Sequence, residues 1–139
     1  SERTEARGNV KGDAFACPDT LAFDARGVLW IGTDVGSRSL NRGEMARLGN
    51  NQLLACDPAT GEVRRFLVGP VGAEITGCSF TPDGTTMFVN VQHPGESPGD
   101  RSDPESPGKH SNWPDFRPGG RPRSATVAVR RNDGGVIGA

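Results

Sequence analysis

The sequence lacks several features that would place it in a familiar class. It has no tyrosine and only three cysteines, and no apolar stretch approaches the ~18 residues that a membrane-spanning helix requires. Its 16 basic and 17 acidic residues nearly cancel, so no strongly basic surface for nucleic acid is expected. The sequence therefore predicts a protein that binds no nucleic acid and enters no membrane.

The cysteines are too few and too scattered for a disulfide framework or a zinc site. Cys17, Cys56 and Cys78 form no Cys-x-x-Cys pair, and an odd number cannot pair completely. We expect each of them to act as a small, buried apolar residue on a strand.

Turn-forming residues are abundant, with 20 glycines and 11 prolines among 139 residues. Short apolar runs are separated by the turn sequences DARG, DPATG, TPDG and NDG, and helical periodicity is nearly absent. This pattern predicts an all-β fold built from antiparallel hairpins.

Acidic residues inside the turns are expected to accept hydrogen bonds from turn N–H groups. They are Asp24, Asp57, Asp83 and Asp133.

The hairpins recur in the same order along the chain. Residues 18–34 are similar to residues 74–91, with Trp30 matching Phe88, and a second hairpin follows each stretch. A repeated four-stranded antiparallel unit is the signature of a propeller blade. The sequence therefore predicts a β-propeller fragment of about two four-stranded blades.

The predicted boundaries follow from this repeat. The final strand is expected in GVIGA, paired across NDG with the strand before it. Because two blades cannot close a propeller, the remaining blades of a longer chain are the expected partners, and the fragment alone would expose apolar surface. The predicted parts are an N-terminal segment (1–12), a first blade (13–70) and a second blade (71–139) with a Pro/Gly-rich loop insert (93–123).

Blade geometry predicts where the acidic residues meet. The start of a blade's first strand and the end of its second lie on one rim, which brings together Asp19, Asp34 and Glu74, with His93 as a further candidate. Clustered carboxylates repel one another unless a cation lies between them. Oxygen ligands suit Ca²⁺, and a carboxylate/histidine mixture also suits iron or manganese. The alternative is that the acids only accept turn hydrogen bonds, and for His93 a solvated or loop-anchoring role is favoured.

One motif is misleading. Trp113–Asp115 reads WPD, as in the acid loop of tyrosine phosphatases, but that chemistry needs a low-pKa cysteine beside an arginine in a phosphate loop. No such loop is present, so Trp113 is expected to pack over the second blade instead. The chain also lacks the glycine-rich phosphate loop and the Gly-x-Ser-x-Gly nucleophile motif.

Three stretches resemble the C-terminal part of the PhoX family of alkaline phosphatases: CPDTLAFDARGVLWIGTD, LLACDPATGEVRRFLVGPVGAEITGCSFTPDGTTMFVNVQHPGE, and SNWPD with the later PRSATVAVRRNDGGVIG. The most specific parts are GAEITG and FVNVQHPGE. The resemblance implies a six-bladed propeller. It also implies a periplasmic or secreted enzyme, exported by the twin-arginine route, that hydrolyses phosphate monoesters. The family's calcium and iron ions lie at the channel mouth, held mainly by carboxylates. The first stretch alone would also fit a calcium-dependent, lactonase-like hydrolase, and a non-catalytic propeller scaffold is the third possibility.

The resemblance also implies roles for individual residues. Glu74, in GAEITG, is the best candidate for a metal ligand, and Asp19 and Asp34 are the next. The family's iron-binding cysteine belongs to a different motif that is absent here, so none of the three cysteines takes that role. No serine, cysteine or histidine nucleophile is expected from this chain.

Overall fold

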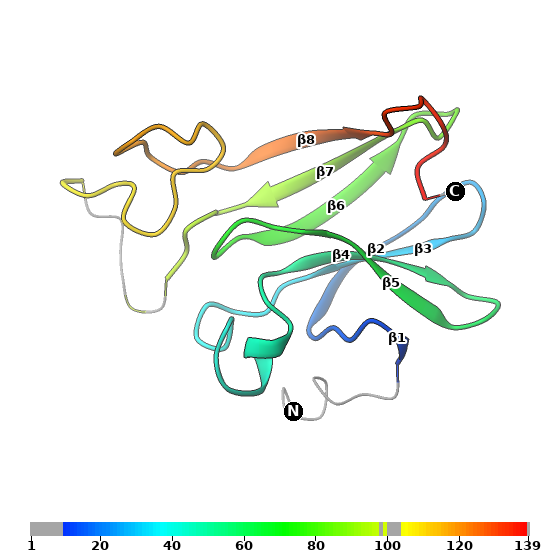
Figure 1. Cartoon of the computed structure of the whole chain (residues 1–139), viewed down its shortest axis with the longest axis horizontal. Helices are drawn as coiled ribbons and strands as arrows, with labels where there is room; N and C mark the ends of the chain where they lie inside the picture. The colour runs from blue at the N-terminus through cyan, green and yellow to red at the C-terminus, as the bar shows by residue number, and fades with distance from the viewer. Residues whose placement is uncertain (1–9, 98, 100–103, 139) are drawn as a thin grey trace.

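The structure, a computed structural model that describes residues 10–97, 99 and 104–138, is built around two β-sheets (Figure 1). The first sheet has the order β1-β5-β4-β3-β2 and the second the order β6-β7-β8. One 3₁₀ helix, η1 (Gly43–Arg47), lies between β3 and β4. The strands are β1 (Lys11–Gly12), β2 (Pro18–Phe23), β3 (Leu29–Thr33), β4 (Gln52–Asp57), β5 (Glu62–Val68), β6 (Glu74–Phe80), β7 (Thr86–Gln92) and β8 (Ala125–Arg130).

The first sheet contains the expected antiparallel meander of four strands, β2 to β5. It also contains a fifth strand that the sequence did not predict, because β1 pairs in parallel with β5 and places Lys11 opposite Glu62. The turns between strands form as expected. In each of them a carboxylate oxygen accepts a backbone N–H, as Asp24 does from Arg26 and Asp57 does from Ala59. All-β architecture with antiparallel sheets is therefore confirmed.

The second sheet differs from expectation at its outer edge. No strand forms over residues 135–138, so three strands are present where four were predicted. Asp133 pairs with Arg131 at 2.7 Å and accepts the N–H of Gly135, which turns the chain away from β8. Ile137 is then buried, and its N–H bonds to the carbonyl of Gly84. This segment closes one end of the gap between the two sheets instead of extending the second.

The two sheets meet through their innermost strands, β2 and β6. The hydroxyl oxygens of Thr20 and Thr76 are 3.2 Å apart across this junction. Beside it, β3 approaches β6 so closely that a Cβ at Gly32 would collide with the carbonyl oxygen of Ile75. A glycine is therefore required at this position for the two blade-like sheets to pack together.

Trp30 fills the space between the sheets. Its side chain is fully buried, and its ring packs edge-on against Phe66 at 4.9 Å and in a tilted arrangement against Phe80 at 5.5 Å. Its indole N–H donates to Asp24. Trp113 packs against the same cluster, as expected from the sequence. The buried members of this core are Trp30, Leu53, Ala73, Ile75, Met87, Val89, Val91 and Ile137.

The outward faces of the two sheets carry exposed apolar side chains. Leu21 and Phe23 on β2 are 62% and 66% exposed, and Phe88 on β7 is 38% exposed. Strand register confirms that Phe88 occupies the position of Trp30, which is fully buried between the sheets. The fragment therefore exposes apolar surface on its outward faces, as predicted for blades that lack their neighbours.

The cysteines behave as small apolar residues. All three are partly buried and form no disulfide, and each packs against a different hydrophobic cluster. Cys56 and Cys78 lie on strands as expected, whereas Cys17 lies just before β2. Burial, together with the charge of Asp24, raises the pKa of Cys78 to about 11. Its thiol is therefore protonated at neutral pH and is a poor nucleophile.

The central position of Trp30 gives a first prediction. Trp30→Ala should lower the free energy of unfolding by about 3–5 kcal/mol, because it leaves a cavity at the junction of both sheets. Urea unfolding followed by circular dichroism measures this loss. Phe116→Ala is the matched control, since that ring is 68% exposed. Equal effects of the two substitutions would contradict the role given to Trp30.

Candidate metal-binding rim

The three predicted acids lie at the same end of the two sheets. Asp34 directly follows β3, and its N–H bonds to the carbonyl of Cys17, just before β2. Asp19 lies in β2 at a bulge, and Glu74 is the first residue of β6. The structure therefore brings the two sheets' acids to one rim, as blade geometry predicted.

Glu74 is the most buried of these acids, with 7% of its surface exposed. The side-chain amide of Gln92 donates to Glu74 Oε2 at 2.8 Å, and His93 Nε2 lies 3.4 Å from the same oxygen. Burial raises the pKa of Glu74, and the negative charges of Asp34 and Asp19 raise it further. These carboxylates are thus close enough to repel one another, and a cation among them would relieve that repulsion.

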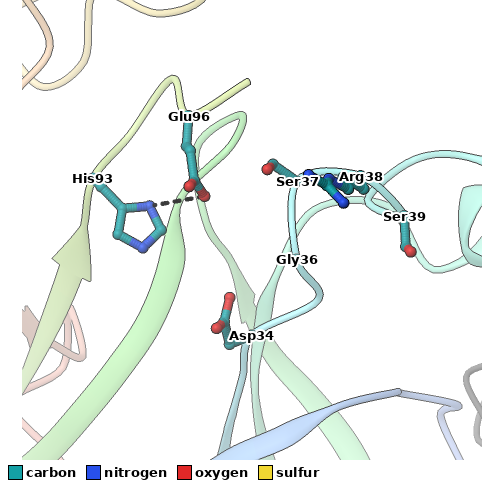
Figure 2. Close-up of a pocket in the computed structure, with 7 residues that line it drawn as sticks. All are labelled: Asp34, Gly36, Ser37, Arg38, Ser39, His93 and Glu96. Carbon is teal, nitrogen blue, oxygen red and sulfur yellow. Dashed lines mark ion pairs between the residues drawn. The ribbon is translucent and has the colours of Figure 1, made fainter. Parts of the chain in front are cut away.

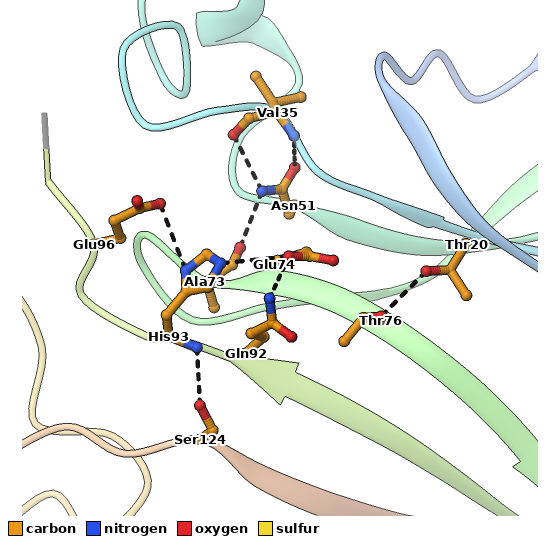
Figure 3. Close-up of polar contacts among 10 residues, drawn as sticks. All are labelled: Thr20, Val35, Asn51, Ala73, Glu74, Thr76, Gln92, His93, Glu96 and Ser124. Carbon is orange, nitrogen blue, oxygen red and sulfur yellow. Dashed lines mark hydrogen bonds and ion pairs between the residues drawn. The ribbon is translucent and has the colours of Figure 1, made fainter.

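His93 joins the turn after β7 to this rim (Figure 3). Its backbone has φ = 36°, an unfavourable value for a residue with a side chain, and its N–H donates to Ser124 Oγ at 3.0 Å. The ring lies between two carboxylates, with Nδ1 3.5 Å from Glu96 Oε2. His93 therefore anchors its loop, as expected, and in addition contacts Glu74.

A buried amide connects the segments that carry Asp34 and Glu74. Asn51 Oδ1 accepts hydrogen bonds from the hydroxyl of Thr33 and the N–H of Val35. Its Nδ2 donates to the carbonyl oxygens of Val35 and Ala73, at 3.3 and 3.0 Å. Val35 follows Asp34 and Ala73 precedes Glu74, so Asn51 fixes the backbone of the two sheets beside both acids (Figure 3).

A pocket of about 420 Å³ opens beside this rim. Asp34 and the loop Gly36–Ser39 line it on one side, and His93 and Glu96 line it on the other (Figure 2). The pocket is large enough for a small ligand and lies next to the cluster of acids.

The rim carries the kinds of side chain that bind metal ions, but too few of them lie close together. Carboxylate oxygens suit Ca²⁺, and a carboxylate/histidine mixture suits iron. Within residues 10–97, 99 and 104–138, however, no three His, Cys, Asp or Glu side chains lie close enough together to hold a metal ion. The described part of the chain thus provides acids at a rim, and a complete metal site requires further ligands.

Sequence reasoning missed four residues of this region, namely Asn51, Gln92, Glu96 and Arg38. Only Gln92 gave a local signal, because it ends the strand that pairs with the one beginning at Glu74. Asn51 and Arg38 owe their surroundings to segments far apart in the chain, whereas Glu96 contacts His93, three residues before it. The four acids in the hairpin turns accept turn N–H groups and take no part in the rim.

The fold and the rim together define a fragment of a propeller-type, all-β protein with acids gathered at one end. Among protein families, residues 1–95 match the one described as Alkaline phosphatase PhoX. The chain belongs to this family. No curated protein matches it.

A solved structure is similar to most of the chain: "Pseudomonas fluorescens PhoX in complex with vanadate, a transition state analogue". The two sequences are 50% identical, and the superposition has a TM-score of 0.78. The match covers 91% of this chain and 20% of the other. The chain therefore spans about a fifth of the length of that phosphatase.

The Asn51 network gives a second prediction. Asn51→Ala should lower the free energy of unfolding by at least about 2 kcal/mol, because it leaves buried backbone and hydroxyl groups without partners. Amide hydrogen exchange over residues 73–76 should also accelerate. Asn112→Ala, which removes one exposed hydrogen bond, is the control. Unchanged exchange at the rim would show that Asn51 does not hold the two segments together.

Proposed function

We propose that this chain is the C-terminal part of a secreted or periplasmic alkaline phosphatase that hydrolyses phosphate monoesters at a calcium/iron cluster. The cluster would lie in the mouth of a six-bladed propeller. The observation that carries the proposal is the 50% identity to PhoX in complex with a transition-state analogue, over 91% of this chain. The meeting of Asp19, Asp34 and Glu74 at one rim supports it.

The proposed roles of the chain's own residues follow from their surroundings. Glu74, Asp34 and Asp19 would hold cations, and Gln92 would keep the buried carboxylate of Glu74 in one orientation through its 2.8 Å hydrogen bond. When bound, the metal ions would neutralise the doubly negative ester and polarise its phosphoryl oxygens. Asn51 would fix the separation of the segments that carry Asp34 and Glu74.

Further parts of the phosphatase would complete the site. The exposed faces at Phe23 and Phe88 offer apolar surface for the remaining blades. Export by the twin-arginine route, which the resemblance to the family implies, is part of the proposal. The described helical segments include none long and apolar enough to cross a membrane.

Chelation tests the proposed function in the complete phosphatase. Hydrolysis of p-nitrophenyl phosphate should be lost after treatment with EGTA and an iron chelator, and calcium and iron should restore it. Lactone hydrolysis serves as the comparison, because a lactonase-like enzyme would cleave a lactone and leave the phosphate ester intact. Phosphatase activity that resists chelation would contradict the metal-dependent mechanism.

The role of Glu74 gives a separate prediction. Glu74→Gln should reduce activity at least about 100-fold and lower the metal content measured by elemental analysis, since an amide is a weaker ligand than a carboxylate. Glu62→Gln, on the outer strand β5 and paired there with Arg64, should change neither quantity. Wild-type turnover with unchanged metal content in Glu74→Gln would show that Glu74 has only a structural role.

A further inference from the structure

Arg38 lies at the tip of a firmly held loop beside the rim. The loop begins at Val35, whose N–H and carbonyl both bond to Asn51. Its other end is closed by hydrogen bonds from the N–H groups of Ser39 and Leu40 to the carbonyl of Gly36, at 2.9 and 3.0 Å. Leu40 is buried in a hydrophobic cluster. The backbone that carries Arg38 is therefore fixed on both sides.

The charge of Arg38 is available at the pocket. Other arginines are occupied, as Arg26 is by Asp24, Arg64 by Glu62 and Arg123 by Asp115. Among the described residues, none forms an ion pair or hydrogen bond with the Arg38 side chain. Arg38 lines the same pocket as Asp34, Glu96 and His93, and it is the arginine in that lining.

This arrangement suits an anion that enters beside acids. A phosphate monoester carries two negative charges and is repelled by the carboxylates of the rim. Cations held by those carboxylates would neutralise the phosphate oxygens that face the rim. The phosphate oxygens that face the pocket would still need a positively charged partner. A guanidinium group offers a planar pair of N–H donors that matches two such oxygens.

We propose that Arg38 is a substrate-binding residue that holds the phosphate group of the monoester, and of the product phosphate, in this pocket. Ser37, which lines the same wall, places a hydroxyl donor beside it. The inference rests on the proposed function and adds to it the protein group that recognises the anion.

The test compares three variants of the complete phosphatase. Arg38→Gln removes the charge and the paired donors, and Arg38→Lys keeps the charge alone. Arg42→Gln removes a neighbouring exposed arginine that does not line the pocket. For each protein we would measure KM and kcat with p-nitrophenyl phosphate, the dissociation constant of inorganic phosphate by calorimetry, and metal content.

Arg38→Gln should raise KM and the dissociation constant of inorganic phosphate about 10- to 100-fold, as expected for a lost hydrogen bond to a charged group. Arg38→Lys should show a smaller rise, and Arg42→Gln none. Metal content should stay unchanged in all three. Calorimetry needs no turnover, so it tests the role of Arg38 even if the wild-type enzyme does not hydrolyse the ester. A wild-type enzyme without hydrolysis would count against the proposed function and not against anion binding by Arg38.

Two outcomes would overturn the inference. Unchanged phosphate binding in Arg38→Gln would show that the arginine does not contact the anion. Loss of metal in Arg38→Gln would show that it supports the rim, for instance by pairing with an acid from another part of the phosphatase.

Discussion

The amide of Asn51 is the constraint on which the rim depends. It is buried, and its four hydrogen bonds tie Thr33 and Val35, on either side of Asp34, to Ala73, the residue before Glu74. Buried polar groups stabilise a structure only when all of them are paired, and this side chain uses every donor and acceptor it has. The opposite end of the sheet junction is held differently, by the apolar contacts of Trp30 and Ile137. A polar link thus fixes the rim end of the junction, and apolar packing supplies much of the cohesion.

Because the rim is fixed, the electrostatic repulsion among its carboxylates persists. Glu74 cannot move away from Asp34 and Asp19 to relieve their repulsion, because Gln92 holds its carboxylate and Asn51 holds its backbone. Burial and neighbouring charge both disfavour its ionised form. A cation among these carboxylates would offset both effects, so a rim held this rigidly favours cation binding. Loose acidic loops would gain less, because they could separate without a metal.

The parts of the fold that could be predicted from the sequence are those set by local chemistry. Turn sequences placed the hairpins, and the repeat then placed Asp19, Asp34 and Glu74 at one end, because strand direction alone decides that. The prediction of a final strand was wrong because the hairpin signal at Asn132–Gly134 specifies a turn and leaves the path of the chain beyond it open. The ion pair of Asp133 and the burial of Ile137 send the chain elsewhere. Asn51 and Arg38 were missed for a related reason, since their surroundings come from segments distant in sequence.

The unequal burial of equivalent residues shows that the outward face of the second sheet is left uncovered in the described part of the chain. Trp30 and Phe88 hold the same position in successive units, yet one is enclosed and the other is 38% exposed. The difference is that the second sheet covers Trp30, whereas no sheet among the described residues covers Phe88. The same reasoning applies to the rim, where Asp19 and Glu74 come from the beginning of an inner strand and Asp34 follows the end of β3. These two units give a group of acids without a complete coordination sphere for a metal. Each further blade would bring its own strand ends to the same end of the propeller channel. Metal binding is therefore expected to depend on the packing of apolar blade faces as well as on the ligands themselves.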